Sequence, residues 1–171
     1  MDQISIRFIR QVDVAAFKTL RLEALREHPE AFGSDYEENS RHPESFWIER
    51  VTKSIDDPVN CIVLADAGDE LAGMMGVYRS HGVKNSHAGN IWGVYVRPKY
   101  RGKKLTDRMI EQAMQWCRSK QLRIVRLAVN VNNAAAIRCY LRCGFMVYGT
   151  SPQELRIGEV YHDEQLMWRS V

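Results

Sequence analysis

The chain has 171 residues, of which 45% are hydrophobic and 26% are charged, and its formal net charge at pH 7 is +3. A chain of this length can bury the core of one globular domain, so we expect a single domain over residues 1–171. The small net charge does not by itself indicate a nucleic-acid partner, and we expect none. No apolar run approaches the roughly 20 residues of a membrane helix, which argues against a membrane protein.

Two further features of the sequence concern the cellular compartment. Residues 1–5 lack the basic and then apolar pattern of a signal peptide. The cysteines include no pair with the spacing of zinc ligands, and we interpret them as reduced thiols, with a redox or metal role as the alternative. We therefore expect a cytoplasmic protein with no metal site. The four cysteines are Cys61, Cys117, Cys139 and Cys143.

Alternating and helical patterns of apolar residues divide the first half of the chain into elements. They predict strands at residues 4–10, 61–65 and 71–78, and helices between Asp13 and His28 and from Pro43 onward. Asp13 is expected to cap the first of these helices. Residues 31–42 contain a cluster of acids and are expected to form an irregular loop.

The second half continues the alternation of strands and helices. After a polar loop at residues 81–89, the pattern predicts strands at 91–96, 124–129 and 145–148, a long helix after Gly102, a short helix from Asn133 to Gly144, and a last strand in the tail. The long helix carries an apolar stripe that is typical of a helix packed on a sheet. The interleaved elements place the chain in the α/β (α+β) class, with one mixed sheet and helices on its faces.

A cluster of cations lies where the long helix begins. The strand at residues 91–96 leads into the segment Arg97-Pro98-Lys99-Tyr100-Arg101-Gly102-Lys103-Lys104. A helix N-terminus exposes unpaired N–H groups and carries about half a positive charge, so cations there are unfavourable unless an anion binds. Gly102 lets a bound group approach the backbone closely. We interpret this turn as a phosphate-binding site, with a solvated basic turn as the alternative.

A second motif follows in the short helix, where Asn133, Ala136, Tyr140, Gly144 and Phe145 stand at fixed spacings. The two motifs together closely resemble those of the GNAT superfamily of acyl-CoA N-acyltransferases. That superfamily has a Val-x-Pro-x-x turn, then Arg/Gln-x-x-Gly-x-Gly/Ala, and later Asn-x-x-Ala-x-x-x-Tyr-x-x-x-Gly-Phe. The chain departs from the phosphate-binding pattern at its two small positions, which hold Lys104 and Thr106. The resemblance covers nearly the whole chain and is strongest over residues 91–145. The later motif is matched by Asn133, Ala136, Tyr140, Gly144 and Phe145.

The resemblance implies a fold, a cofactor and a set of site residues. The fold is a mixed, mostly antiparallel sheet of about seven strands flanked by about four helices, with the strands at 91–96 and 124–129 splaying apart. Acetyl-CoA is the implied co-substrate, and Asp107 would lie at the edge of its pyrophosphate. Tyr140 is the implied catalytic acid, which would protonate the departing thiolate. The implied cofactor-binding residues are Val94, Tyr95, Val96, Arg101, Gly102, Lys103, Lys104, Leu105, Thr106 and Asn133.

The resemblance leaves the catalytic base open. Asn90 stands near the position of a glutamate that many relatives carry, and an amide cannot take a proton. The sequence offers His81, His87, Glu37 and Glu38 instead, and a chain of waters is an equal alternative. On the strand that follows Asn90, we expect a backbone N–H near Val94 to stabilise the negative charge that develops on the thioester oxygen.

The acceptor is expected to be a primary amine of a small molecule or a peptide, which attacks the thioester directly. Its site is expected in residues 31–42, near Trp47 and Phe46, and in residues 81–89 and 150–162. Acids in the first of these segments and just after it either attract a cationic amine or are simply solvated; they are Asp35, Glu37, Glu38 and Glu44.

Two other functions are compatible with the sequence. A non-catalytic CoA-binding or sensing module is favoured by the two lost small residues and by the absence of the strand glutamate. A nucleic-acid-binding protein would use the basic stretch at residues 97–108, but the sequence shows no aromatic stacking surface or reading helix. Homodimers are frequent in the superfamily, so a homodimer is a further expectation that no single residue decides.

Overall fold

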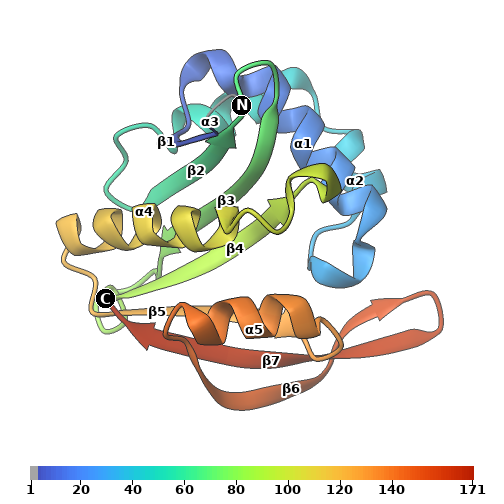
Figure 1. Ribbon diagram of the computed structural model, residues 1–171, viewed down its shortest axis with the longest axis vertical. Coiled ribbons are helices and arrows are strands. Elements are labelled where there is room, and N and C mark those ends of the chain that lie inside the picture. Colours follow the sequence, from blue (N-terminus) through green and yellow to red (C-terminus); the bar gives the residue numbers. More distant parts are fainter. Residues whose placement is uncertain (1–3) are drawn as a thin grey trace.

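The computed structural model describes residues 4–171. Residues 1–3 belong to the N-terminal segment in which no signal-peptide pattern was found, and they lie outside the described part. The chain folds as a mixed sheet with helices on both faces (Figure 1). No helix of the described residues is long and apolar enough to cross a membrane. The elements are β1 (Ser5–Phe8), α1 (Val14–Glu27), α2 (Tyr36–Ser40), α3 (Glu44–Thr52), β2 (Asn60–Asp66), β3 (Leu71–Arg79), β4 (Ala88–Val96), α4 (Leu105–Ser119), β5 (Ile124–Asn130), α5 (Ala134–Arg142), β6 (Met146–Ile157) and β7 (Val160–Ser170).

The sheet has seven strands in the order β1-β2-β3-β4-β5-β7-β6. Every neighbouring pair is antiparallel except β4 and β5, which are parallel. The pairing of β4 with β5 ends at Asn90 and Arg126, and beyond these residues the two strands diverge (Figure 1). The predicted mixed, mostly antiparallel sheet with splayed strands is therefore confirmed.

A β-bulge lies in β4 where this divergence begins. The register between β3 and β4 shifts, so that Gly93 and Val94 both lie opposite Met75. Gly93 has a φ of 65°, which is a left-handed conformation that glycine adopts without steric strain. A bulge bends its strand and increases the local twist, and this one lies just beyond the last residue of β4 that pairs with β5.

Each face of the sheet has its own hydrophobic core. On one face, α4 and α5 pack their apolar sides on the strands with Met109, Met114 and Tyr140. On the other face, α1 and α3 contribute Phe17, Leu20 and Trp47 to a second cluster. Because β4 and β5 part at the sheet's centre, the gap between them is open to both layers of helices.

Three details of the predicted elements are wrong. Residues 31–42, predicted as an irregular loop, contain the short helix α2, which is one of the five α-helices of the described residues. The Asp35 carboxylate accepts a hydrogen bond from the Glu38 N–H at 2.9 Å and caps this helix. Asp13 does not cap α1, since its carboxylate instead binds Arg7 at 2.7 and 2.8 Å. The strand predicted at 145–148 extends to Ile157 as β6.

Candidate functional site

A cleft of about 820 Å³ lies between the diverging ends of β4 and β5. Its walls come from β4 from Ile91 onward, from β5 from Leu127 onward, and from the turn before α4. The inner side of α5 and the segment that follows α1, from His28 to Phe32, complete it. The cleft therefore joins the α4–α5 face of the sheet to the α1–α3 face.

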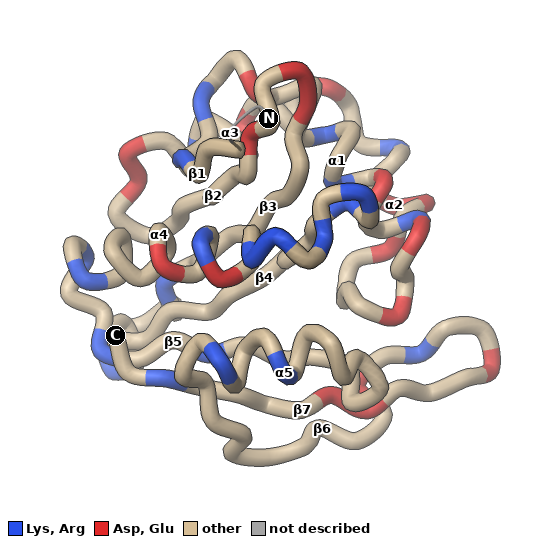
Figure 2. Tube along the Cα trace, in the orientation of Figure 1, with Lys and Arg blue, Asp and Glu red and all other residues tan. Residues whose placement is uncertain are grey.

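The turn before α4 opens the N-terminus of this helix to the cleft. The helix begins at Leu105, and its N-cap residue Lys104 makes no side-chain capping hydrogen bond. The first main-chain N–H groups of a helix have no intrahelical partners, so they are available to an anion. The exposed side chains of Arg101, Lys103 and Lys104 surround these groups, and Figure 2 shows this run of cations between β4 and α4.

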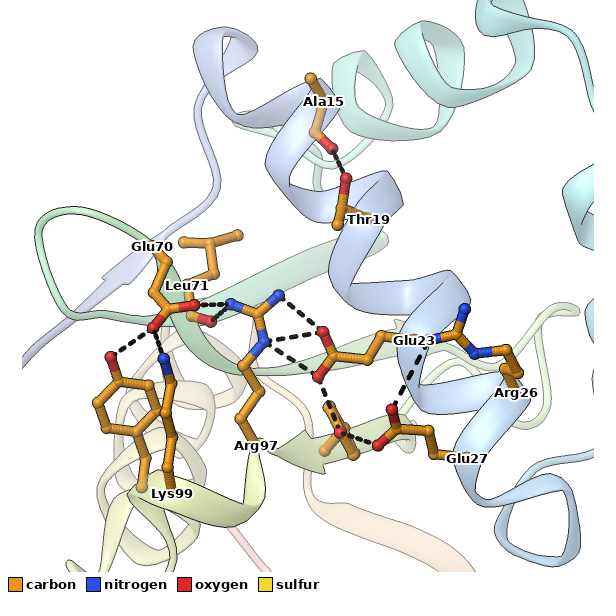
Figure 3. A network of polar contacts seen from close by, with 11 residues as sticks. Ala15, Thr19, Glu23, Arg26, Glu27, Glu70, Leu71, Arg97 and Lys99 are labelled. Atoms are coloured by element: carbon orange, nitrogen blue, oxygen red, sulfur yellow. Dashed lines mark hydrogen bonds and ion pairs between the residues drawn. The ribbon is translucent and has the colours of Figure 1, made fainter.

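Two cations of the predicted basic cluster are already neutralised by acids. Arg97 donates hydrogen bonds to the Glu23 carboxylate at 2.8 and 3.0 Å and also pairs with Glu70 (Figure 3). Lys99 pairs with Glu70, and the Tyr100 hydroxyl donates to the same carboxylate at 2.7 Å. This network fixes the start of the turn to α1 and β3. The cations left for a phosphate are those after residue 100.

The backbone of the turn shows why its glycine is needed. Gly102 has a φ of 80°, and a Cβ at this residue would meet no other atom within 4 Å. The glycine therefore serves the conformation of the turn and leaves its outer side open. Lys104 also has a positive φ, of 54°, which glycine adopts more readily than lysine does. This positive φ explains why the family pattern has a small residue at the position of Lys104.

The cleft brings together all but one of the predicted cofactor-binding residues. The side chains of Tyr95 and Leu105 are 4% and 3% exposed and belong to the two cores, so their backbone is the part that faces a ligand. Lys103 does not line the cleft, although it adjoins the turn. The predicted residues that line it are Val94, Tyr95, Val96, Arg101, Gly102, Lys104, Leu105, Thr106 and Asn133.

Arg101 lies across one end of the cleft. Its Nε donates to the Val96 carbonyl oxygen at 3.0 Å, and its Nη2 contacts the His28 Nε2 at 3.0 Å. The exposed Arg101 side chain therefore covers the last main-chain acceptor of β4 and one nitrogen of the His28 ring.

The α5 side of the cleft carries the predicted acid. Tyr140 is 6% exposed, and its ring packs edge-on against Phe145 with centroids 5.9 Å apart. Burial raises the pKa of the Tyr140 phenol, so the group stays protonated at neutral pH. Asn133 caps α5 by accepting a hydrogen bond from the Ala136 N–H at 3.1 Å, and it lines the cleft.

Asp107 joins the beginning of α4 to α5. Arg142 binds the Asp107 carboxylate with two hydrogen bonds, at 2.8 and 2.9 Å, and these bonds lower the pKa of Asp107 against the effect of burial. The ion pair neutralises an acid that would otherwise repel phosphate. Asp107, Cys139 and Cys143 also form the one group of potential metal ligands among residues 4–171, with ligand atoms within 4.8 Å of one another.

The structure changes the choice of titratable residues near the cleft. His81 and His87 belong to the loop before β4, and Asn90 belongs to the end of β4 that pairs with β5; none of the three lines the cleft. His28 and Glu30 do line it, and the His28 Nδ1 lies 3.6 Å from a Glu30 carboxylate oxygen. The sequence showed this histidine only as a helix end, because residues that meet across a fold give no local signal.

The elements expected to form the acceptor site contribute unevenly. Ala31 and Phe32 line the cleft, but no residue from 150–162 does, and Trp47 is fully buried in the core. Of the expected acids, Asp35 caps α2 and Glu37 lies 3.7 Å from Arg41 in an ion pair. The acidic segment at residues 35–38 therefore does not provide unpaired charge inside the cleft.

A comparison with known families decides the class of protein. Residues 19–145 match the sequence model of the acetyltransferase (GNAT) family. The chain belongs to this family. The family expected from the two motifs is thereby confirmed, and so is the enzyme class of an acetyl-CoA-dependent acetyltransferase. A curated relative, the streptothricin acetyltransferase of Escherichia coli, is 38% identical over 56 residues. That match covers 33% of this chain and 32% of the relative's length.

Solved structures of GNAT proteins share the whole fold at low sequence identity. A GNAT-family acetyltransferase from Streptococcus pneumoniae aligns with a TM-score of 0.87 and 20% identity over 99% of both chains. The yncA protein of Salmonella typhimurium, solved with its cofactor acetyl-CoA, has a TM-score of 0.82 and 18% identity over 98% of this chain and 94% of its own. Spermidine N-acetyltransferase from Vibrio cholerae, in complex with CoA and spermine, has a TM-score of 0.78 and 19% identity over 99% and 96%. These alignments confirm the predicted fold class.

Proposed function

We propose that this GNAT protein transfers an acetyl group from acetyl-CoA to a primary amine of a small molecule or a peptide. The observation that carries the proposal is the cleft itself. It combines an open helix N-terminus with free cations, a splayed strand with a bulge, and a buried phenol in one continuous space. Each of these features answers one requirement of thioester aminolysis.

The cofactor enters from the α4–α5 face. Its pyrophosphate binds the main-chain N–H groups from Arg101 to Thr106, and the pantetheine extends along β4 toward the bulge, pairing with main-chain groups of Val94 and Val96. Asn133 contacts the cofactor from the α5 side. The family neighbour solved with acetyl-CoA supports acetyl-CoA as the co-substrate.

The acceptor amine approaches from the α1 side of the cleft, because the cofactor fills the other side. The neutral amine attacks the thioester carbon, and the N–H of Val94 at the bulge stabilises the oxygen that becomes negative. When the C–S bond breaks, the Tyr140 hydroxyl donates its proton to the departing thiolate. The products are the N-acetyl amine and CoA with a free thiol.

His28 is our choice for the base that takes the proton from the attacking amine. Its Nε2 contacts a guanidinium N–H of Arg101, so this nitrogen holds the lone pair in the neutral ring, while Nδ1 faces Glu30. Displacement of Arg101 by the cofactor frees the lone pair. The test is His28→Gln, which should lower turnover and change the pH dependence of kcat/KM while leaving the affinity for CoA unchanged.

A non-catalytic CoA-binding module is the second candidate, because Lys104 and Thr106 occupy positions that are small in the family pattern. The deciding experiment mixes the protein with acetyl-CoA and a broad panel of amines and follows the release of free thiol. Amine-dependent thiol release supports the transferase. Calorimetric binding of CoA without consumption of any amine in the panel supports the binding module.

Other expectations from the sequence stay predictions. They are the single domain over residues 1–171, the cytoplasmic location, the absence of a metal and of a nucleic-acid partner, and a homodimer. The reaction proposed here uses a backbone N–H, a phenol and an imidazole, and so it has no step that requires a metal.

A further inference from the structure

Two arginines on the α1–α3 face carry buried positive charge without acidic partners. Arg21 of α1 is 3% exposed, and its Nε and Nη1 are buried without a hydrogen-bond partner. Arg50 of α3 is half-buried, and neither arginine takes part in an ion pair among residues 4–171. A buried guanidinium without acceptors is unfavourable, so such a pair indicates a missing anion.

The two guanidinium groups converge on one aromatic ring. The Cζ of Arg50 lies 4.5 Å from the ring centroid of Trp92, and the Cζ of Arg21 lies 5.6 Å from it. Cation–π contact holds each group in place but does not satisfy its N–H donors. Burial, together with the charge of Arg50, lowers the pKa of Arg21 to about 10, so both groups are still cations at neutral pH.

Arg21 lies directly behind the reacting end of the cleft. A Cβ placed on Gly93 would lie only 3.4 Å from the Arg21 Nη1, so this nitrogen points at the bulge of β4. The Arg21 Cζ also lies 5.0 Å from the ring centroid of Phe32. Gly93, Phe32 and Trp92 line the cleft, whereas Arg21 and Arg50 do not, so the unpartnered donors lie directly behind this wall, beside the bulge, and a ligand reaches them past these three residues.

This site is distinct from the site proposed for the pyrophosphate. The turn at residues 101–106 precedes α4, whose buried side belongs to the core on the opposite face of the sheet. Phe32, Trp92 and the helices that carry the two arginines belong to the α1–α3 core. One molecule of CoA bound along β4 therefore leaves the two arginines unpaired, on the side from which the acceptor approaches.

We propose that Arg21 and Arg50 bind the carboxylate of the acceptor, and that the acceptor is an α-amino acid. The inference rests on the proposed acetyl transfer and narrows its substrate. A carboxylate has the planar shape and charge that a guanidinium binds best. In an α-amino acid a single carbon separates the carboxylate from the amine, so a carboxylate at Arg21 places the amine beside the bulge. Phe32 and Trp92 then contact the side chain of the amino acid.

The experiment compares α-amino acids with their carboxamides, which keep the amine and lose the negative charge. The wild type should acetylate amino acids with a kcat/KM at least tenfold above that of the matched carboxamides. Arg21→Met should raise KM for the amino acids about ten- to hundredfold, the range for hydrogen bonds to a charged group, and should leave KM for the carboxamides unchanged. Arg26→Met, which removes an exposed guanidinium from the same helix, should change neither value.

A thermal melt separates binding from a purely structural role. Removal of an unpaired buried charge in favour of an apolar side chain of similar length should keep or raise Tm. If Arg21→Met does not fold, Arg50→Met provides the same comparison from α3. Carboxamides acetylated as well as amino acids, or KM values unchanged in both variants, would overturn the proposal.

The outcomes also distinguish this proposal from the proposed function. If no amine is acetylated, calorimetry with CoA present and an α-amino acid as titrant tests the pocket alone. Binding by the wild type that is lost in Arg21→Met supports the pocket although the transferase proposal fails. Absence of any difference between amino acid and carboxamide binding refutes the pocket.

Discussion

Replacement of Tyr140 by Phe isolates one hydroxyl in the cleft. The phenyl ring keeps the edge-on contact with Phe145, whose ring centroid lies 5.9 Å away, and it keeps the place in the core that makes Tyr140 only 6% exposed. The substitution therefore removes a proton donor and little else. The affinity for acetyl-CoA should stay within about a factor of two, because the ring still forms the same wall of the cleft.

The size of the effect follows from the role proposed for the hydroxyl. A positioned general acid contributes about 10²- to 10⁴-fold to rate, so kcat for Tyr140→Phe should fall by at least about a hundredfold. The free energy of unfolding should change by no more than about 1 kcal/mol at pH 7, the net value of one hydroxyl hydrogen bond. A large effect on kcat together with a small effect on stability is the result expected if the hydroxyl acts as the general acid.

Alkaline pH provides an independent check on the burial of the same phenol. Burial raises the pKa of Tyr140 in the folded protein above its ordinary value of 10.0. The protonated phenol's contribution to the free energy of unfolding is therefore complete below pH 10 and is lost as the pH rises toward the pKa of the folded protein. Tyr140→Phe should therefore lose less stability than the wild type as the pH rises above about 10.

Thiol release with a fixed amine and denaturant unfolding measure the two quantities. His81→Gln, which replaces an exposed residue outside the cleft, is the control and should match the wild type in both. A Tyr140→Phe enzyme with wild-type kcat would refute the assignment of the acid. Loss of acetyl-CoA affinity together with kcat would mean that the hydroxyl serves binding.

Three further predictions concern the walls of the cleft. Gly76→Ala places a Cβ 2.1 Å from the Trp92 ring, so it should destabilise the fold by about 1–3 kcal/mol in denaturant unfolding and raise KM for the acceptor but not for acetyl-CoA. Lys104→Gly relieves a φ of 54° and should leave calorimetric affinity for acetyl-CoA unchanged or tighter; a large loss would identify the ammonium as a phosphate ligand. Arg97→Met removes the ion-pair partner of Glu23 and one of the two cations at Glu70, which keeps Lys99, and it should destabilise the protein by about 2 kcal/mol at pH 7. Burial alone would raise the pKa of Glu23, but hydrogen bonds from Arg97 and Tyr95 outweigh it and lower that pKa, so this destabilisation should shrink as unfolding is measured below about pH 4.

The sequence predicts those parts of the site that local patterns encode. A strand, a basic turn and a helix N-terminus are contiguous, and Tyr140 follows Asn133 at a fixed spacing on one helix. The divergence of β4 and β5 came from the family resemblance and is confirmed by the end of their pairing at Asn90. These features need no knowledge of how distant segments meet.

The rest of the site depends on contacts between residues that are far apart in the sequence. Arg97 belongs to the basic stretch in sequence, yet Glu23 and Glu70 neutralise it from two other elements. Arg21 resembles an ordinary helix residue until the bulge at Gly93 and the α3 helix enclose it. The short helix α2 was missed because acids after Asp35 were interpreted as a loop, although acids in a first helical turn favour the helix.

A crystal structure of the protein with acetyl-CoA tests the central claim most directly. We predict that the pyrophosphate lies on the main-chain N–H groups between Arg101 and Thr106, and that the pantetheine lies between β4 and β5 with the thioester beside Gly93. The Arg101 side chain should have left the Val96 carbonyl. A cofactor bound elsewhere, or a cleft still closed by Arg101 at saturating acetyl-CoA, would contradict the account.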